Sequence, residues 1–430
     1  MLVKKENLGQ FFFFLGVFLL SSTLVFSALF LIIAALIGSF TNNKNYFKDN
    51  WNKSFFICGS LILLSTIFQN YILTNPNPGL WNPNLSFVGL ANWLPFFWLF
   101  WGFQPYLNNK DKRRNLGLIL ISGSFPVILT GFGQYFFNWN GPFELFNGLI
   151  VWYQKPIEVT RGLSGLFSNQ NYAGCWLNFI WPFCLAFILE KNQVFYKKSI
   201  AFAFLISVGL ATFLTISRSA WGGLLISLPL VIGSESLIWI IPLLLLFIFF
   251  TNWIVSPLFS GDLQNFFREL INKDFWLRFS PEGYSQYTFQ DTRIAIMLNA
   301  IKYSFFRPFI GLGAASFPVI YEVQTNIWKG HTHNLFLELS VSYGIPSAVI
   351  LFSTILILLF ISGKILFNNP KDQKYKDLYD RAIWASIFFF LVSQLVDVQY
   401  FDGKVSILAW ILLTCLKNIV DEKKFKYDDL

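Results

Sequence analysis

Both histidines of this chain fall in one five-residue stretch, Gly330-His331-Thr332-His333-Asn334. Histidine exchanges a proton near neutral pH and therefore suits a general base, a role worth roughly 10²–10⁴-fold in rate. We predict that His333 has this role, because it stands at the mouth of an apolar segment long enough to cross a membrane, whereas His331 is dispensable. Asn334 and Glu338, which begin that segment, are predicted to bind substrate or assist His333. The alternative for His333 is a helix cap or an interfacial position.

Two arginines are candidates for binding a phosphorylated ligand. A guanidinium group matches phosphate oxygens in a planar, bidentate way and keeps its charge, so a pair of arginines suits a diphosphate. Arg218 lies in a turn of two or three residues between two apolar segments, and Arg293 begins an amphipathic stretch that runs to about Tyr303. The alternatives are that Arg218 reaches lipid headgroups and that Arg293 anchors a helix on the membrane surface.

Four more polar residues lie near the same predicted side of the membrane. Arg161, Asn169 and Asn171 precede one apolar segment, and Asp397 lies near the outer end of another. We predict that they contact substrate. Asn169 and Asn171 equally fit turn and capping positions, and Asp397 equally fits an interfacial position.

The sequence predicts neither a metal nor a cofactor. The predicted outer loops contain no Asp-x-Asp pair, no His-x-x-His motif and no cysteine cluster, and the chain has no Walker motif and no Gly-x-Ser-x-Gly elbow. The pair His331-x-His333 lacks identified further ligands, and Gly311-x-Gly313 alone is a weak phosphate signal.

These residues must be positioned by a membrane protein. Hydrophobic residues make up 55% of the 430 residues and charged residues only 13%, which is too little polar surface for a soluble protein of this size. We expect an all-α polytopic integral membrane protein of about twelve transmembrane helices with one long, partly helical periplasmic loop. The predicted spans are 9–21, 24–40, 54–72, 88–107, 115–134, 173–190, 199–216, 219–235, 237–254, 335–367, 381–399 and 404–420.

The distribution of positive charge predicts the orientation of these spans. With both termini in the cytoplasm, 21 of the 32 Lys and Arg residues fall on the inner side, and seven of the other 11 lie in the long loop 255–334. The excess of Lys and Arg on the cytoplasmic side accounts for the net charge of +9. The absence of a dense basic block argues against nucleic acid as a partner. Three polar clusters, Arg161 to Asn171, Arg218, and Arg293 to His333, then face the outer side.

The predicted spans and loops divide the chain into four units. Residues 1–134 hold the first five spans, with a tight hairpin at Ser21-Ser22-Thr23, and residues 135–254 hold an outer loop and spans six to nine. Residues 255–334 form the large periplasmic loop, and residues 335–430 hold the last three spans and a cytoplasmic tail.

Five short motifs together resemble the O-antigen ligase and polymerase superfamily, over roughly residues 120 to 360. The motifs are Gly165-Leu166-Phe167-Ser168-Asn169-Gln170-Asn171, Thr215-Ile216-Ser217-Arg218-Ser219-Ala220-Trp221, Asp291-Thr292-Arg293, Gly311-Leu312-Gly313, and His333-Asn334-Leu335-Phe336-Leu337-Glu338 leading to Gly344-Ile345-Pro346. The chain departs from the pattern at Ser342-Tyr343-Gly344, where many relatives place a carboxylate just before the glycine.

The resemblance implies a metal-independent membrane glycosyltransferase of the bacterial inner membrane. Such an enzyme moves a glycan from an undecaprenyl diphosphate carrier to an acceptor sugar hydroxyl in lipopolysaccharide and cell-envelope polysaccharide biosynthesis. The acceptor is a lipid A core for a ligase and another carrier-linked glycan for a polymerase. By the family pattern, Arg218 and Arg293 bind the diphosphate, and His333 acts as the base or positions the acceptor.

Two alternatives come from other functional classes. The superfamily includes cyanobacterial members labelled as bicarbonate transporters, so a small-anion transporter is the main rival. A scaffold subunit of an envelope glycan complex is the second. A transporter is expected to place charged or broken helices near the membrane midplane, whereas the polar clusters of this chain lie at predicted helix ends and in loops. This placement favours transfer chemistry.

Overall fold

The computed structural model describes residues 2–42, 45–72, 81–191, 193–256, 261–270, 280, 288–368 and 377–428. The helices and strands are α1 (Leu2–Leu19), α2 (Leu24–Thr41), α3 (Asn50–Ile67), α4 (Leu85–Leu90), α5 (Leu94–Gly102), α6 (Lys110–Gly123), α7 (Phe125–Phe137), β1 (Phe143–Leu145), β2 (Ile150–Trp152), α8 (Ile157–Thr160), α9 (Gln170–Leu189), α10 (Phe195–Leu214), α11 (Arg218–Val231), α12 (Leu237–Val255), α13 (Asp262–Leu270), α15 (Arg293–Ser304), α16 (Ser316–Thr325), α17 (Leu335–Tyr343), α18 (Ile345–Phe367), α19 (Leu378–Ser393) and α20 (Gly403–Asp428).

Within these residues, nine helical segments are long and apolar enough to cross a membrane. They are Leu24–Thr41, Asn50–Tyr71, Leu85–Gly102, Lys110–Phe137, Gln170–Leu189, Phe195–Leu214, Ser234–Val255, Ile345–Phe367 and Gly403–Lys423. Helix satisfies every backbone hydrogen bond within its own segment, which is what a lipid environment requires. The prediction of an all-α polytopic membrane protein is therefore confirmed. Three further predicted spans correspond to α1, α11 and α19, which are not among the nine, so the number twelve stays a prediction.

Residues 2–41 form two helices, as the turn residues predicted. Helices α1 and α2 pack against each other along their length, and the turn between them contains Ser21 and Thr23. The Ser21 hydroxyl donates a hydrogen bond to the carbonyl oxygen of Gly123 (2.6 Å), and the Ser27 hydroxyl donates to Gly16 (2.7 Å). These bonds fasten the hairpin to itself and to α6.

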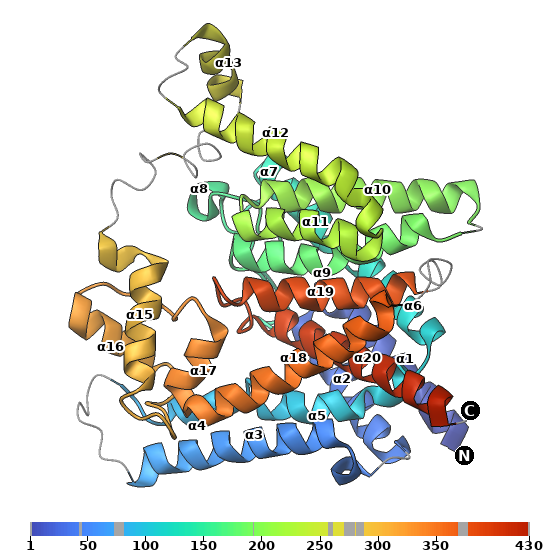
Figure 1. Ribbon diagram of the computed structural model, residues 1–430, viewed down its shortest axis with the longest axis vertical. Helices are drawn as coiled ribbons and strands as arrows, with labels where there is room; N and C mark the ends of the chain where they lie inside the picture. Colours follow the sequence, from blue (N-terminus) through green and yellow to red (C-terminus); the bar gives the residue numbers. More distant parts are fainter. Residues whose placement is uncertain are drawn as a thin grey trace.

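The helices run between two ends of the molecule (Figure 1). One end, here the terminal end, holds both chain termini, the α9–α10 connection, the end of α18 and the start of α19. The other, the loop end, holds α15, α16, α17 and the starts of α9, α11 and α20. At the terminal end the buried Arg113 bonds to Asp380 (2.6 Å) and to Glu422 (2.7 Å), which ties α6 to α19 and α20.

The predicted span 335–367 is wrong at its beginning. The segment breaks at Gly344 into α17, which has nine residues, and α18, which has 23. Gly344 has φ +90°, and a Cβ there would lie 2.4 Å from the carbonyl oxygen of Phe309. Pro346 in the first turn of α18 lacks the N–H that would continue a helix from α17. Helix α17 is therefore a separate element at the loop end.

The predicted span 381–399 extends too far toward its end. Helix α19 ends at Ser393, and residues 394–402 form a loop before α20. The Gln394 side chain shapes this loop, because its carbonyl oxygen accepts from the N–H groups of Gln399 (3.1 Å) and Tyr400 (3.2 Å). Asp397 thus lies inside a fixed loop and not in a helix.

The predicted loop 255–334 is helical in much of its described part, where it contains α13, α15 and α16. Its residues 257–260, 271–279 and 281–287 lie outside the described residues. Helices α15 and α16 pack against α17 around a small apolar core. This core consists of Ile296, Ala300, Tyr303, Phe317, Tyr321 and Val341. The side of the membrane on which the loop lies stays a prediction.

Residues 135–160 contain a feature that the sequence did not predict. Strands β1 and β2 pair antiparallel, with Glu144 opposite Val151. The indole N–H of Trp152 donates to the carbonyl oxygen of Ser22 (2.8 Å), so the hairpin rests on the α1–α2 turn.

Candidate functional site

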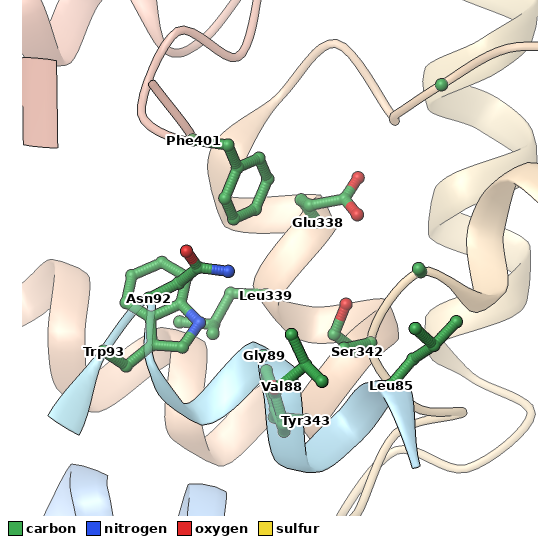
Figure 2. A pocket seen from close by; sticks show the side chains of 13 residues that line it. Leu85, Val88, Gly89, Asn92, Trp93, Glu338, Leu339, Ser342, Tyr343 and Phe401 are labelled. Atoms are coloured by element: carbon green, nitrogen blue, oxygen red, sulfur yellow. The ribbon is translucent and has the colours of Figure 1, made fainter. Parts of the chain in front are cut away.

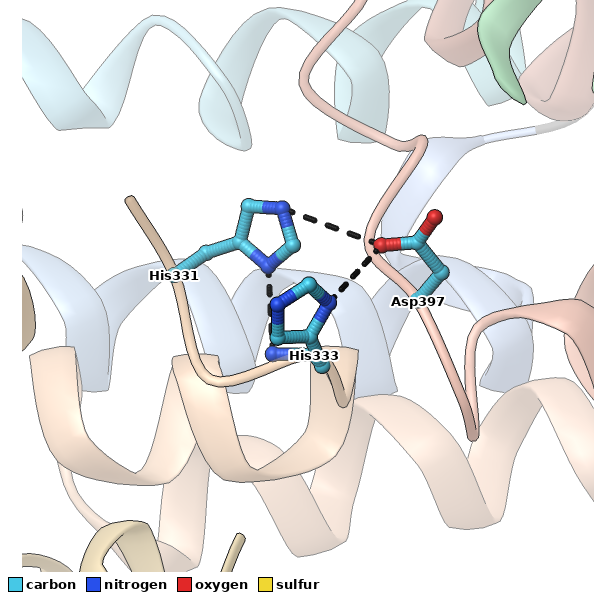
Figure 3. Close-up of side chains that lie close together, drawn as sticks. All are labelled: His331, His333 and Asp397. Atoms are coloured by element: carbon cyan, nitrogen blue, oxygen red, sulfur yellow. Dashed lines mark hydrogen bonds and ion pairs between the residues drawn. The ribbon is translucent and has the colours of Figure 1, made fainter. Parts of the chain in front are cut away.

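A histidine–aspartate pair joins the residue before α17 to the 394–402 loop (Figure 3). Nδ1 of His333 is 3.1 Å from Oδ1 of Asp397, although the two residues are 64 positions apart in the chain. His333 has φ +55°, an uncommon backbone conformation for a residue with a side chain. An ionised carboxylate only accepts hydrogen bonds, so the pair places the ring proton on Nδ1 and leaves the lone pair on Nε2. This is the arrangement that a general base needs.

Three hydrogen bonds hold the segment that carries His333. Asn334 caps α17, since its side-chain oxygen accepts from the N–H of Leu337 (3.0 Å). Its side-chain amide donates to the carbonyl oxygen of Leu395 (3.1 Å), and the N–H of Leu335 donates to Gln394 (3.0 Å). The start of α17 is thereby fastened to the loop that contains Asp397. Asn334, predicted to bind substrate, has a clear positioning role.

Asp397 is held in place on both oxygens. Oδ1 accepts from the N–H of Val398 (3.0 Å), and Oδ2 accepts from the side-chain amide of Asn171 (3.0 Å). Only 6% of its surface is exposed. Burial alone would raise the pKa of Asp397, but the hydrogen bond from His333 and the charge of Arg293 lower that pKa below its usual value. The carboxylate is therefore ionised and available to hold the imidazole.

The start of α9 brings the two predicted asparagines to this pair. Asn169 caps α9 by accepting from the N–H of Asn171 (2.7 Å), and Asn169 itself is exposed. Asn171 points its amide at Asp397. Of these two asparagines, Asn171 reaches the histidine–aspartate pair directly, and Asn169 acts through the helix that it caps.

Arg161 and Arg218 lie on adjacent segments. The N–H of Leu163 donates to the carbonyl oxygen of Leu214 (2.8 Å), and a Cβ on Gly162 would lie 2.2 Å from the carbonyl oxygen of Thr215. The loop after Arg161 therefore packs directly on the turn before Arg218. Both arginine side chains are exposed.

The starts of α11 and α9 lie side by side at the loop end. The amide of Asn178 in α9 donates to the carbonyl oxygen of Ala220 (3.0 Å), and a Cβ on Gly174 would lie 2.8 Å from the Cβ of Ala220. Arg218 is the first residue of α11, as the predicted short turn between two apolar segments required. The first N–H groups of both helices add partial positive charge next to this arginine.

Arg293 reaches the same site from a third direction. It is the first residue of α15, which Thr292 caps by accepting from the N–H of Ala295 (3.3 Å). Nζ of Lys329 lies 3.1 Å from Oδ1 of Asp291, and this ion pair ties the start of α15 to the segment that leads to the histidines. The charge of Arg293 is among the causes that lower the pKa of Asp397, and the Arg293 side chain is exposed.

His331 lies beside the pair and is bonded to the backbone of His333. Its Nδ1 accepts from the backbone N–H of His333 (3.1 Å), and its Nε2 lies 3.8 Å from Oδ1 of Asp397. Burial, together with the charge of His333, lowers the pKa of His331 to about 4. The imidazole is therefore neutral at pH 7.

The three side chains also form a group that could hold a metal ion. Within the described residues, the ligand atoms of His331, His333 and Asp397 lie within 4.8 Å of one another. The sequence showed only the two histidines, and Asp397 is the third ligand that it did not reveal. Because Nδ1 of His331 already accepts a hydrogen bond, its proton sits on Nε2, the atom that faces Asp397. A metal at that atom would have to displace this proton and break the bond to His333, so the arrangement favours a hydrogen-bonded dyad.

One protein family matches a segment of this chain. Residues 201–352 match the family model described as O-antigen ligase. This match supports the resemblance to the O-antigen ligase and polymerase superfamily. None of the curated proteins compared with the chain matches it. The O-antigen ligase segment contains Arg218, Arg293 and His333, whereas Asp397 and Asn171 come from outside it. The chain thus combines helices that are long and apolar enough to cross a membrane with a segment that matches the O-antigen ligase family model.

Glu338 lies behind the histidines in the O-antigen ligase segment. One of its carboxylate oxygens accepts from the backbone N–H of Thr332, between the two histidines, at 2.9 Å. Burial raises the pKa of Glu338 to about 7. Glu338 contributes to a cavity of about 240 Å³ (Figure 2). The cavity is lined by Leu85, Val88, Gly89, Asn92, Trp93, Ala314, Ala315, Gly330, Glu338, Leu339, Ser342, Tyr343 and Phe401.

We expect the Glu338→Gln variant to change the pH dependence of stability. A carboxyl whose folded pKa rises from 4.5 to about 7 stabilises the fold below pH 4.5, and this stabilisation is lost as pH rises through 7. Between pH 4.5 and 7, the unfolding free energy of the wild type should fall by up to about 3 kcal/mol. The unfolding free energy of the Gln variant should not show this fall, because its side chain does not ionise. Denaturant unfolding in detergent from pH 4.5 to 8 measures it, with the exposed Glu322→Gln on α16 as control. Parallel pH curves for wild type and Glu338→Gln would contradict the expectation.

The Gly-x-Gly pair of this segment has a packing role. Gly311 has φ +67°, and a Cβ there would lie 2.6 Å from the backbone of Ser342. The N–H of Gly313 donates to the carbonyl oxygen of Ser342 (3.0 Å). The two glycines therefore let the 308–315 loop lie directly on the end of α17, which explains their spacing without a phosphate.

Proposed function

We propose that this protein transfers a glycan from an undecaprenyl diphosphate carrier to a hydroxyl group of an acceptor sugar, without a metal ion. One observation carries the proposal: His333, with its ring bonded to Asp397, lies at the same end of the molecule as Arg218 and Arg293. A base with a free Nε2 and two permanently charged guanidinium groups are what transfer from a diphosphate requires. The match of residues 201–352 to the O-antigen ligase family supports it.

In this reaction, Nε2 of His333 takes the proton of the acceptor hydroxyl while its oxygen attacks the anomeric carbon of the donor. The bond from that carbon to the diphosphate oxygen breaks, and the electron pair leaves with undecaprenyl diphosphate. Attack from the side opposite to the leaving group inverts the anomeric carbon. Asp397 stabilises the imidazolium that forms, as a carboxylate does for a catalytic histidine.

The arginines act on the leaving group. Negative charge grows on the diphosphate as the bond breaks, and preorganised positive groups stabilise it without reorganisation. We assign this role to Arg218 and Arg293, and we assign to Arg161, on the segment beside Arg218, contact with the same substrate. Asn169 and Asn334 contribute through the helices that they cap.

We further propose that the loop end faces the periplasm and that both termini lie in the cytoplasm of a bacterial inner-membrane protein. Both termini lie at one end of the molecule and the candidate site at the other, which supports this orientation (Figure 1). So does the positive charge, with 21 of 32 Lys and Arg residues on the predicted inner side. Residues 255–334 then form a periplasmic loop, and the acceptor is a lipid A core or another carrier-linked glycan.

The test is the release of undecaprenyl diphosphate from a lipid-linked oligosaccharide by the purified protein in lipid nanodiscs. We expect release that depends on an acceptor, survives EDTA, and is lost in Arg218→Ala, Arg293→Ala and His333→Ala. The matched control is His331→Asn, because an Asn side chain at this position can accept from the backbone N–H two residues on, as Nδ1 of His331 does. This variant should keep activity.

Two outcomes would overturn the proposal. The first is no release with any acceptor while the same protein in liposomes takes up bicarbonate, which would assign it to anion transport. The second is release that EDTA abolishes and His331→Asn abolishes as well, which would turn the three-residue group into a metal site.

A further inference from the structure

The cavity beside Glu338, here the α4–α17 cavity, combines aromatic and polar side chains (Figure 2). Trp93, Tyr343 and Phe401 supply aromatic surface. Asn92 and Glu338 supply an amide and a carboxyl. Trp93 is fixed by stacking on Tyr400, with ring centroids 4.7 Å apart, so this surface is rigid. The cavity is therefore preformed, as small-molecule sites usually are.

The chemistry of the lining selects the class of ligand. A sugar ring has an apolar C–H face, which packs on aromatic rings, and hydroxyl groups, which need both donors and acceptors. The amide of Asn92, the hydroxyl of Ser342 and the carboxyl of Glu338 offer both kinds of group. A volume of about 240 Å³ is below the roughly 300–1,000 Å³ of pockets for drug-sized molecules and suits a ligand as small as one ring.

Other ligands fit this lining less well. None of the described residues that line the cavity is Lys, Arg or His, and Glu338 would repel a phosphate when ionised. A lipid acyl chain would bury the Glu338 carboxyl and the Asn92 amide against hydrocarbon, which is costly. A neutral polyhydroxyl ligand satisfies the polar groups and covers the aromatic ones.

The position of the cavity distinguishes acceptor from donor. The donor sugar is bonded to the diphosphate and so must lie beside the arginines at the starts of α11 and α15. In Figure 1, α17 and the 394–402 loop lie between α4 and the starts of α9 and α11. The cavity is thus bordered by the segments that carry His333 and Asp397, since Gly330, Glu338 and Phe401 belong to them.

We propose that the α4–α17 cavity binds a sugar ring of the acceptor glycan and presents a neighbouring hydroxyl to His333. This assignment rests on the proposed glycan transfer. Glu338 contributes twice, because it lines the cavity and its carboxylate holds Thr332 between the two histidines.

The experiment blocks the cavity without disturbing its walls. Val88 on α4 lines the cavity, yet 67% of its surface is exposed, so Val88→Trp fills the cavity mouth without a cost to the core. The control Phe87→Trp places the same residue on the same helix at a position outside the lining, where Phe87 contacts Tyr71 with ring centroids 6.3 Å apart. A second variant, Asn92→Ala, removes the amide but keeps the space.

Two measurements are made on the full chain in nanodiscs. In acceptor-dependent release, we expect Val88→Trp to raise the acceptor KM at least tenfold, with kcat within threefold and the donor KM unchanged, and Asn92→Ala to raise it severalfold. In saturation-transfer NMR with methyl glycosides of hexoses, heptoses and N-acetylhexosamines at millimolar concentration, we expect a signal with wild type and Phe87→Trp that Val88→Trp abolishes.

The two measurements separate failure of this assignment from failure of the proposed function. An unchanged acceptor KM in Val88→Trp, or an increase in the donor KM instead, would overturn the acceptor cavity while glycan transfer stands. Absence of any release by wild type would overturn the proposed function, and the glycoside signal would still test the cavity. The cavity would be overturned as a sugar site if wild type gave no glycoside signal, or if the signal persisted in Val88→Trp.

Discussion

The Asp397→Asn variant is expected to lower kcat for glycan transfer by about 10²–10⁴-fold, with donor and acceptor KM values within threefold of wild type. The carboxylate of Asp397 holds the proton on Nδ1 of His333 at 3.1 Å and is itself fixed by Asn171 and Val398. An amide in its place can donate to Nδ1 and so favour the tautomer with the proton on Nε2. His333 would then have no lone pair for the acceptor hydroxyl, and nothing would stabilise the imidazolium.

The chain offers a direct measurement of this tautomer, because it has only two histidines. With ¹⁵N-labelled imidazoles, the signals of His333 are assigned by comparison with His331→Asn. We expect Nδ1 of His333 to carry the proton in wild type and to lose it in Asp397→Asn. The control is Asp402→Asn, since Asp402 lies in the same loop but accepts from the N–H groups of Lys404 and Val405 at the start of α20. A loss of activity in Asp397→Asn with an unchanged His333 tautomer would mean that Asp397 acts only on the fold.

The parts of the fold that the sequence predicted are those set by local chemistry. Apolar length located the membrane helices, and Ser21-Ser22-Thr23 located the α1–α2 hairpin. The breaks at Gly344 and after Ser393 were missed because apolar composition continues through both of them. At Gly344 the break comes from the approach of Phe309, and after Ser393 from the Gln394 side chain, and neither contact is visible in a hydrophobic profile.

The sequence likewise predicted only part of the candidate site. The sequence singled out His333, Arg218 and Arg293 from residue type and predicted sidedness, and the structure places all three at one end. It could not reveal that Asp397 bonds to His333, because that contact joins residues 64 positions apart through a loop that was predicted as helix. Nor could it distinguish Asn171, which reaches Asp397, from Asn169, which caps α9.

The arginine at the start of α15 provides the second large effect. We expect Arg293→Ala to lower kcat/KM for the lipid-linked donor by about 10²–10³-fold, the loss seen when one preorganised group is removed from a developing negative charge. Arg293→Lys should recover only part of this activity, because an ammonium group keeps the charge but not the bidentate geometry. The matched control is Lys302→Ala, an exposed cation in the last turn of the same helix, which should leave kcat/KM unchanged.

Two further comparisons separate diphosphate binding from anchoring of α15 on anionic lipid. If Arg293 and Arg218 hold one diphosphate, the Arg218→Ala/Arg293→Ala double variant should lose less than the product of the two single losses, because groups that act as a unit are not additive. Inhibition by added inorganic pyrophosphate should weaken in both single variants, because each lacks one of the two groups that hold a diphosphate. An anchoring role predicts the reverse: the Arg293→Ala defect would disappear in nanodiscs without anionic lipid, and pyrophosphate inhibition would be unaltered. Since a diphosphate and a lipid headgroup are different ligands, a defect that persists without anionic lipid is the result that diphosphate binding predicts.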